Sequence, residues 1–550
     1  MNHKPIHLFF ALAMLLGTAL SAQNFTVNGT LKDASNGEDL IGATVIVKEK
    51  PTVGTATNAY GFYSLTLPKG EYTLRFQFIG LTAIEQKITL DRNLKLDKEL
   101  VPETATTIAE VVIKSEKADK NVTKNEMSVT KLDPKDVENV PVIFGEKDIV
   151  KTLQLTPGVK SAGDGNAGFY VRGGAVDQNL ILLDEAPVYN ASHLLGFFSV
   201  FNSDALKDVT LYKGTMPAEY GGRGSSVLDI KMKDGNNKKF NASGGIGAIS
   251  SRLTLEAPLQ KDEGSFIVSA RRTYADVFLK FSKKESTRNT RLYFYDLNTK
   301  ANYRLGAKDR LFLSGYFGRD VLGASLFGLD WGNATGTLRW NHLFSDRIFS
   351  NTSAIFSNFN YQFGFGAEGA NITVKASIQD ANLKQDFSFF PNSRNTIKFG
   401  LNYIHHTFLP TSLDAGEGSS FSDSKTEKKF AHEGGVYAQN DWKITDRLGL
   451  NYGLRYSLFD YVGKGTAYTF DKNGNKTGEK AYKNGESIQF YHGLEPRLGL
   501  KFQIDDVSSI KAGLSRNYQY MQLLSNSTTF MLSSAPRNFR SMLGPGRADV

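Results

Sequence analysis

Residues 448–458 read Leu-Gly-Leu-Asn-Tyr-Gly-Leu-Arg-Tyr-Ser-Leu, a stretch in which apolar side chains alternate with small or polar ones. Successive side chains of a β-strand point to opposite faces of the sheet, so this period of two predicts a strand with one apolar and one polar face. The same period recurs at residues 293–305 and 497–504. Runs of about ten residues with this alternation are typical of transmembrane β-barrel strands, whereas strands of a soluble β-sandwich usually have about 5–6 residues.

The connections between these runs fall into two lengths. Short polar turns at residues 307–309, 345–347 and 445–447 fit the periplasmic side of a barrel, and longer Gly-, Ser- and Lys-rich stretches at 411–429 and 463–487 fit external loops. The sequence therefore predicts an antiparallel transmembrane β-barrel over residues 237–532, with outer-membrane lipid around it.

The N-terminal residues predict export. A short basic start precedes an apolar run at residues 8–20, and small residues at 21 and 22 precede Gln23. The run is too short to span a bilayer comfortably, so we interpret residues 1–22 as a cleaved signal peptide and place the barrel in the cell outer membrane.

Residues 23–100 predict a small β-sandwich, because short alternating runs are separated by Asn-Gly, Tyr-Gly and Pro-Lys-Gly turns. The pattern Gly54…Thr57-Asn58…Gly61-x-Tyr63 resembles the carboxypeptidase-regulatory-like domain, a name that implies no peptidase activity. His492 and Glu495 have the His-x-x-Glu spacing of zinc peptidases. They stand directly before Pro496 and an alternating strand, so we interpret them as a polar loop meeting a strand, and we predict no metal site.

Residues 126–236 carry a series of linked motifs. They include Phe169-Tyr170-Val171-Arg172-Gly173-Gly174, an apolar strand at 180–184, Pro217-Ala218-Glu219-Tyr220-Gly221-Gly222-Arg223 and a second strand at 225–230. This order strongly resembles the plug domain of TonB-dependent receptors, and several barrel segments resemble the Bacteroidetes-type members of that family. The resemblance implies an α/β plug inside the barrel. The predicted fold class is therefore mainly β, with an N-terminal β-sandwich, an α/β plug domain and a partial antiparallel transmembrane β-barrel.

Residues 101–125 are polar and charged, as expected of a linker. Within them lies the strip Thr107-Ile108-Ala109-Glu110-Val111-Val112-Ile113, which can add as a strand to the edge of a partner's sheet. The alternative is a last strand of the sandwich. By its position before the plug the strip looks like a TonB box. The resemblance then implies contacts of Ile108, Glu110, Val111, Val112 and Ile113 with TonB, which is driven by ExbB and ExbD.

Two sets of plug residues are candidate site residues. Charged side chains of a plug are expected to face a wet, charged barrel wall, and we predict plug–barrel contacts for Arg172, Glu219 and Arg223. Tyr189, Asn190 and His193 are candidate substrate contacts, and the alternative is packing between plug and wall. The substrate stays open among siderophore, haem, vitamin, metal, glycan and peptide.

The predicted barrel is incomplete. We count about twelve to thirteen candidate strands, whereas barrels with a plugged lumen close with about 22. Residues 533–550 form an atypical tail without alternation. We therefore expect a truncated or frame-shifted reading, with the departure near Arg537.

The predicted function is energy-coupled import of a scarce nutrient by a TonB-dependent receptor. The alternatives are a non-energised porin-like channel, or a surface binding protein if the truncated barrel does not form. No nucleophile–base arrangement is evident, so neither an enzyme nor a cofactor is predicted, and the adjacent His405 and His406 point to opposite strand faces. The 65 basic and 56 acidic residues are spread along the chain, which argues against nucleic acid as a partner. A SusD-like lipoprotein partner is possible but not implied.

Overall fold

The computed structural model describes residues 23–522, apart from 104–121, 123, 133, 135–136, 138–145, 164–167, 325–326, 367–371, 416–422 and 424–425. The chain forms two compact units, of which the first contains the β-sandwich and the second contains the plug and a large sheet. Within the described residues, no helix is both long enough and apolar enough to cross a membrane.

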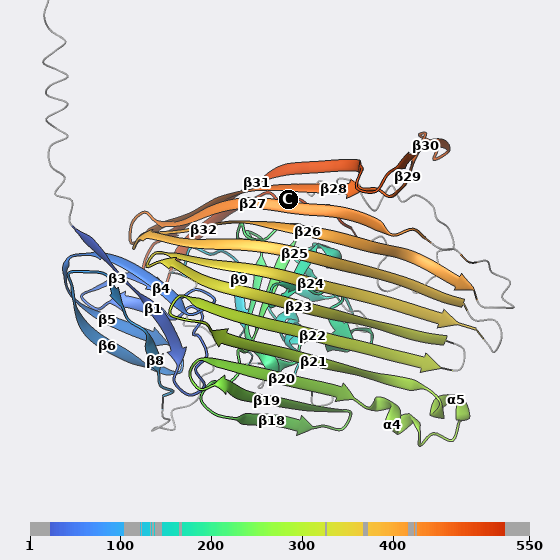
Figure 1. Cartoon of the computed structure of the whole chain (residues 1–550), viewed down its shortest axis with the longest axis horizontal. Coiled ribbons are helices and arrows are strands. Elements are labelled where there is room, and N and C mark those ends of the chain that lie inside the picture. The colour runs from blue at the N-terminus through green and yellow to red at the C-terminus, as the bar shows by residue number, and fades with distance from the viewer. Residues whose placement is uncertain are drawn as a thin grey trace, which may run out of the picture. The chain divides into compact units, whose positions relative to one another are not determined.

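The first unit is a sandwich of two sheets (Figure 1). One sheet has the order β4-β1-β7, with β8 also paired to β1, and the other has the order β3-β2-β5-β6. Alternate residues such as Val27, Val45 and Phe76 are fully buried between the sheets, as expected for inward-facing positions. The strands are β1 (Asn24–Asp33), β2 (Thr44–Val47), β3 (Lys50–Ala56), β4 (Phe62–Pro68), β5 (Gly70–Phe78), β6 (Leu81–Leu90), β7 (Leu94–Lys95) and β8 (Lys98–Leu100).

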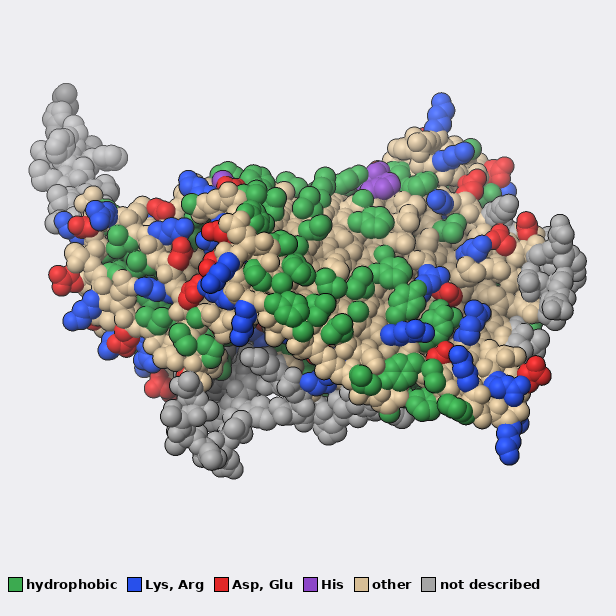
Figure 2. Space-filling view, turned by 60° about the horizontal axis from the view of Figure 1, so that its bottom comes forward, with side chains coloured by type: hydrophobic (Ala, Val, Ile, Leu, Met, Phe, Trp, Pro, Cys, Tyr) green, Lys and Arg blue, Asp and Glu red, His purple; other side chains and the backbone are tan. Residues whose placement is uncertain are grey.

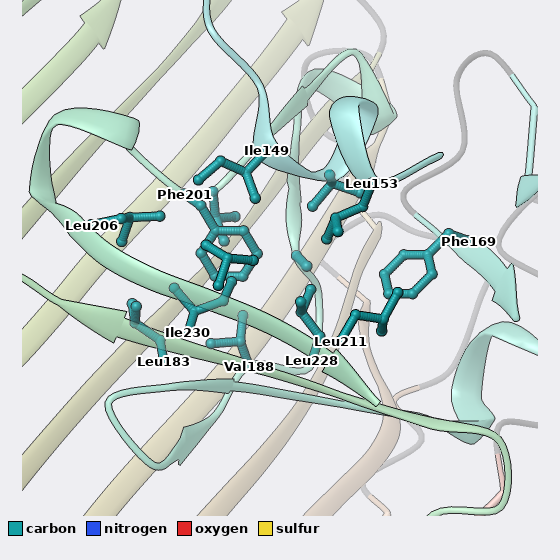
Figure 3. Close-up of a cluster of buried hydrophobic side chains, with 14 of the residues drawn as sticks. Ile149, Leu153, Phe169, Leu183, Val188, Phe201, Leu206, Leu211, Leu228 and Ile230 are labelled. Atoms are coloured by element: carbon teal, nitrogen blue, oxygen red, sulfur yellow. The ribbon is translucent and has the colours of Figure 1, made fainter. Parts of the chain in front are cut away.

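The plug is a small mixed domain built around a five-stranded sheet of order β13-β12-β17-β16-β9. Its helix α3 starts after Asp148, whose side chain accepts a hydrogen bond from Lys151 N at 3.0 Å, a typical N-cap. Figure 3 shows side chains from α3, such as Ile149, pointing toward Phe201, Leu211 and Ile230 in one buried apolar cluster. The elements are β9 (Val129–Leu132), α3 (Ile149–Gln154), β10 (Val159–Ser161), β11 (Phe169–Val171), η3 (Val176–Gln178), β12 (Asn179–Leu183), β13 (Ala186–Pro187), β14 (Ser192–His193), η4 (Leu194–Gly196), β15 (Phe198–Ser199), η5 (Ser203–Ala205), β16 (Leu206–Lys213) and β17 (Ser226–Met232).

The large sheet has thirteen antiparallel strands, from β18 in sequence order to β28 and then β31 and β32 (Figure 1). A separate hairpin, β29–β30, lies in the connection between β28 and β31. Over the described residues the sheet is not closed, and β18 and β32 are its edges. The elements are β18 (Asn241–Ile246), β19 (Ser250–Gln260), β20 (Gly264–Thr273), α4 (Ala275–Leu279), α5 (Glu285–Arg288), β21 (Arg291–Arg304), β22 (Asp309–Ala324), β23 (Phe327–Ser345), β24 (Ile348–Phe365), β25 (Ile372–Asn392), β26 (Asn395–Ala415), β27 (Lys429–Lys443), β28 (Leu448–Val462), β29 (Gly465–Phe470), β30 (Lys476–Tyr482), β31 (Ser487–Gln503) and β32 (Ser509–Ser515).

The two faces of this sheet reverse the burial expected of a soluble protein. On β31, Leu494 and Leu498 are 53% and 44% exposed, while Glu495 and Arg497 are 0% and 3% exposed. Figure 2 shows exposed hydrophobic side chains gathered as a broad green band. An outward apolar band and a polar interior are the features of a transmembrane barrel wall. The polar, buried side is called the inner face below.

The predicted fold class is therefore confirmed: the chain is mainly β, with a sandwich, an α/β plug and an antiparallel sheet that forms part of a barrel.

Candidate functional site

The candidate site is the interface between the plug and the inner face of the sheet. Residues 216–222 of the plug lie against β27, β28 and β31. Arg497 donates a hydrogen bond to Met216 O at 3.1 Å and pairs with Glu495 at 2.9 Å, and Ala218 N donates to Gln439 at 2.6 Å. A Cβ atom added at Gly221 would collide with the guanidinium of Arg455, so glycine allows the close approach there.

A second contact is made by the turn between β12 and β13. Its two residues, Asp184 and Glu185, have φ values of 46° and 75°, which is the left-handed conformation that a two-residue type I′ hairpin turn requires at both positions. The conformation costs about 1–3 kcal/mol for a non-glycine residue. The inner face holds the turn in place, because Lys300 Nζ lies 3.0 Å from Asp184 Oδ2 and Arg339 Nε lies 3.3 Å from Glu185 Oε1.

The acids of this contact are charged in spite of being buried. Burial raises the pKa of Asp184, but Lys300 and Arg339 lower it more, so the pKa lies below its ordinary value. The pKa of Glu185 is lowered in the same way, with Arg339 as the main opposing charge. Asp234, which follows β17, also has a pKa well below its ordinary value, because Lys207 and Lys300 outweigh the effect of burial. These carboxylates therefore act as anions that anchor the plug.

A third contact surrounds Arg271 on β20. Its guanidinium donates to Asp296 Oδ2 on β21 at 2.7 Å and to the plug backbone at Ser199 O at 2.8 Å, and it lies 3.4 Å from Glu146 of the plug. Arg271 is 3% exposed and Asp296 is 2% exposed. A buried ion pair of this kind is costly to break, because the remaining charge loses its partner away from water.

His193, a candidate substrate contact, is buried in the same region. Its Nδ1 lies 2.7 Å from Asp320, its Nε2 lies 3.3 Å from Asp296, and its ring stacks on Phe294 with centroids 4.0 Å apart. Burial lowers the pKa of His193, but Asp320 and Asp296 raise it more, so the pKa lies above its ordinary value. This placement agrees with the alternative of packing between plug and wall. A substrate contact at His193 stays a prediction.

The other two candidate substrate contacts lie nearby. Tyr189 is half-buried and donates to Asp380 Oδ2 on β25 at 2.6 Å. Asn190 accepts bonds from Ser192 through its side chain, and its carbonyl oxygen accepts from Asn333 at 2.7 Å. The structure thus brings Tyr189, Asn190 and His193 together along the inner face.

The three predicted plug–barrel contacts have different surroundings. Glu219 lies 2.9 Å from Lys398 Nζ on β26. Arg223 donates to the plug backbone at Gly222 O at 2.8 Å, and its guanidinium interacts electrostatically with Glu433 of β27. Arg172 is exposed and donates to Ser128 within the plug. Its left-handed φ of 49° places it in a turn of the plug.

The wall residues of these contacts were missed by sequence reasoning. Lys300 and Arg339 each occupy a polar position in an alternating strand, and that position was the only signal available. Arg271 lies beside Arg272 in a strand without clear alternation, so no local pattern marks it. The candidate TonB contacts, Ile108 and 110–113, lie outside the described residues.

Comparison with known proteins gives three family models that match consecutive parts of the chain. They are a CarboxypepD_reg-like domain over residues 27–113, a TonB-dependent receptor plug domain over 121–227 and an outer membrane beta barrel domain over 365–544.

Two curated proteins are similar to the chain. It is 26% identical over 275 residues to the TonB-dependent transporter Oar of Myxococcus xanthus. This match covers 47% of this chain and 25% of Oar. It is 28% identical over 96 residues to the TonB-dependent receptor P3 of Formosa agariphila, covering 17% of this chain and 10% of that protein. The matches therefore span a quarter or less of these relatives.

Solved structures show the same fold. The hemophore receptor HasR of Serratia marcescens matches with a TM-score of 0.53 and 13% identity, covering 73% of this chain and 64% of HasR. The copper transporter OprC matches with a TM-score of 0.55 and 12% identity over the same shares. The three family models and the two curated relatives therefore show that the chain carries the domains of the TonB-dependent outer-membrane receptors with an N-terminal carboxypeptidase-regulatory-like domain.

Proposed function

We propose that the chain acts in energy-coupled import of a scarce small nutrient across the outer membrane. The observation that carries the proposal is the seating of the plug on the inner face through buried charges from several strands, with Lys300, Arg271 and Arg497 as examples. A plug held in this way obstructs the interior of the wall, so passage requires work to displace or reshape it.

The proposed source of that work is TonB, driven by ExbB and ExbD. The outer membrane has neither ATP nor an ion gradient, so the energy has to come from the inner membrane through a partner that spans the periplasm. The strip 107–113 is the proposed attachment point, where TonB would add a strand to it. The regulatory-domain match extends to residue 113, so the alternative of a last sandwich strand stays open for this strip.

An aromatic cluster on the inner face is the proposed place of ligand docking. Phe459 and Tyr520 are buried and stack with centroids 5.5 Å apart. Tyr518 and Tyr491 stack on Tyr520 at 6.0 and 6.4 Å, and Arg516 lies 5.0 Å from the ring of Tyr518. Stacked rings beside a guanidinium favour a ligand with a flat ring and a negative charge, a description that fits haem, aromatic siderophores and some vitamins.

The test is a cross-link between the receptor and TonB in its source cell. A photo-reactive amino acid is placed at position 110, and Ile108→Pro or Val112→Pro is added. Proline removes a backbone donor and disfavours strand pairing. We expect a cross-link to TonB that both proline variants abolish, while Lys117→Pro, outside the strip, preserves it.

Three outcomes would contradict the proposal. A cross-link that survives both prolines would show that strand addition is not the contact. Its complete absence, together with ion conductance in planar bilayers, would favour the porin-like alternative. Release of the chain from outer membranes by salt would favour the surface binding protein.

A further inference from the structure

Two histidines meet on the outward face of the large sheet. His405 of β26 and His432 of β27 are directly opposite in the strand register. Their rings are tilted with centroids 5.0 Å apart, and their Nδ1 atoms are 3.4 Å apart. The neighbouring His406 points to the inner face, where it contacts Asp380 and Glu433. The pair therefore arises from strand pairing and not from the adjacent histidines in the sequence.

A third polar group adjoins the pair. The hydroxyl of Tyr403, which is 43% exposed, lies 2.7 Å from His432 Nδ1. In the tautomer in which Tyr403 donates to this nitrogen, His432 Nδ1 is unprotonated and carries a lone pair. An unprotonated imidazole nitrogen is the form that binds metal ions.

The spacing of the two nitrogens suits one metal ion. Zinc binds histidine nitrogen at about 2.0–2.1 Å in tetrahedral geometry, so two such ligands on one ion are about 3.3 Å apart. The Nδ1 atoms of His405 and His432 already have nearly this separation. We propose that His405 and His432 form a surface site for a divalent transition-metal ion, which joins β26 to β27 on the outward face.

The outward face at the level of the pair carries both apolar and polar side chains. Leu401 and Val436, which are nearer the 391–394 and 444–447 turns, are 48% and 53% exposed. Asp460 lies opposite His432 in the register and accepts a hydrogen bond from Ser487 at 2.6 Å. A carboxylate is costly at the lipid-facing midplane and much less so near an interface. The presence of Asp460 beside His432 therefore favours a level near the interface, where water and ions have access.

The ligand type limits the choice of metal. Imidazole suits zinc, copper and nickel, whereas magnesium and calcium prefer oxygen ligands. Among the described residues, no group of three or more His, Cys, Asp or Glu side chains is arranged to hold a metal ion. The proposed site therefore has two protein nitrogens, and water or the Tyr403 oxygen completes the coordination. This site is separate from the inner face and does not depend on the proposed transport function.

The test is titration of the full chain in detergent with zinc ions, followed by calorimetry. We expect saturable binding that His405→Ala and His432→Ala each abolish. His492→Ala is the matched control, because His492 is also exposed on the outward face but packs beside Tyr456 and Phe490. It should bind zinc like the wild type, and an excess of magnesium should not compete.

A second variant distinguishes loss of the zinc site from misfolding of the chain. His432→Gln keeps an acceptor for Tyr403 but supplies a poor zinc ligand, so it should retain the wild-type circular dichroism and still lose the binding. The proposal is overturned if His405→Ala and His432→Gln bind zinc as the wild type does, or if His492→Ala removes the same site.

Discussion

Replacing Lys300 with methionine is expected to loosen the plug from the wall. The Lys300 ammonium lies 3.0 Å from Asp184 Oδ2 and 2.9 Å from Asp234 Oδ1, and it donates to Met232 O at 3.0 Å. One cation thus serves three acceptors on the plug and its final residues, and its side chain is 4% exposed. Methionine has a similar length but neither charge nor donor, so Lys300→Met removes these bonds and leaves little cavity.

The expected loss follows from the charges that remain. Removing one partner of a buried ion pair costs about 3–5 kcal/mol. Asp234 keeps Lys207 at 2.7 Å, so we expect the lower end, about 3 kcal/mol. Without Lys300 the pKa of Asp184 should rise, because Lys300 is the largest contribution that lowers it. Protonation then removes the buried charge, so the loss should be smaller at pH 4.5 than at pH 7.5.

Tryptophan fluorescence can follow plug release during a urea titration. Trp331 is 4% exposed on the inner face, and its indole lies 3.4 Å from Ser192 O of the plug. The chain has three tryptophans, and Trp340 and Trp442 are outward-facing, so changing these two to phenylalanine leaves one probe of docking. With a slope of about 1–3 kcal/mol per molar urea, a loss of about 3 kcal/mol lowers the midpoint by roughly 1–3 M.

Two comparisons decide whether the reasoning holds. Lys308→Met changes an exposed lysine in the turn after β21 and should alter stability by less than about 0.5 kcal/mol. Asp184→Asn combined with Lys300→Met removes the buried carboxylate as well as its partner, so the double variant should be less destabilised than Lys300→Met alone. The account is refuted if Lys300→Met behaves like Lys308→Met, or if the double variant is the less stable one.

Three further predictions use the same urea assay. Because the pKa of His193 is raised in the folded protein, protonation of this residue stabilises the fold. This stabilisation is complete below about pH 6.5 and is lost as the pH rises through the folded pKa. The urea midpoint of the wild type should therefore fall in alkaline buffer, and that of His193→Gln should fall less. Gly222→Ala should lower the free energy of unfolding by more than about 1 kcal/mol, because φ is +78° and the new Cβ would lie 2.5 Å from Glu433. In the control Gly224→Ala the new Cβ would lie 3.6 Å from its nearest neighbour, so the loss should be smaller. Glu219→Gln should cost about 1 kcal/mol or less, because the side chain of its partner Lys398 is 41% exposed and solvent screens the pair; a larger loss would contradict this account.

The sequence by itself determined the alternating strands of the large sheet and the face that each of their side chains takes. It was wrong about His492 and Glu495, which were expected in a polar loop but lie within β31, and about residues 463–487, which contain the hairpin β29–β30. Alternation is a local property, so residues 448–458 predict both the strand β28 and its apolar outward face, with Arg455 on the opposite side. The plug could be identified in the same way, because its motifs are short, contiguous and ordered along the chain. The opposite orientations of His405 and His406 also follow from a period of two.

The tertiary structure alone decided which partners these side chains meet. Lys300 and Asp184 are far apart in the sequence, and so are His193 and Asp320; their contacts depend on how the plug is seated against the wall. The pairing of His405 with His432 depends on strand register, in which a shift of one residue would turn His432 to the other face. Register and seating are set by many long-range contacts acting together, and no local pattern records them. For that reason the sequence left His193 open between a substrate contact and packing against the wall, and only the fold places it beside two carboxylates.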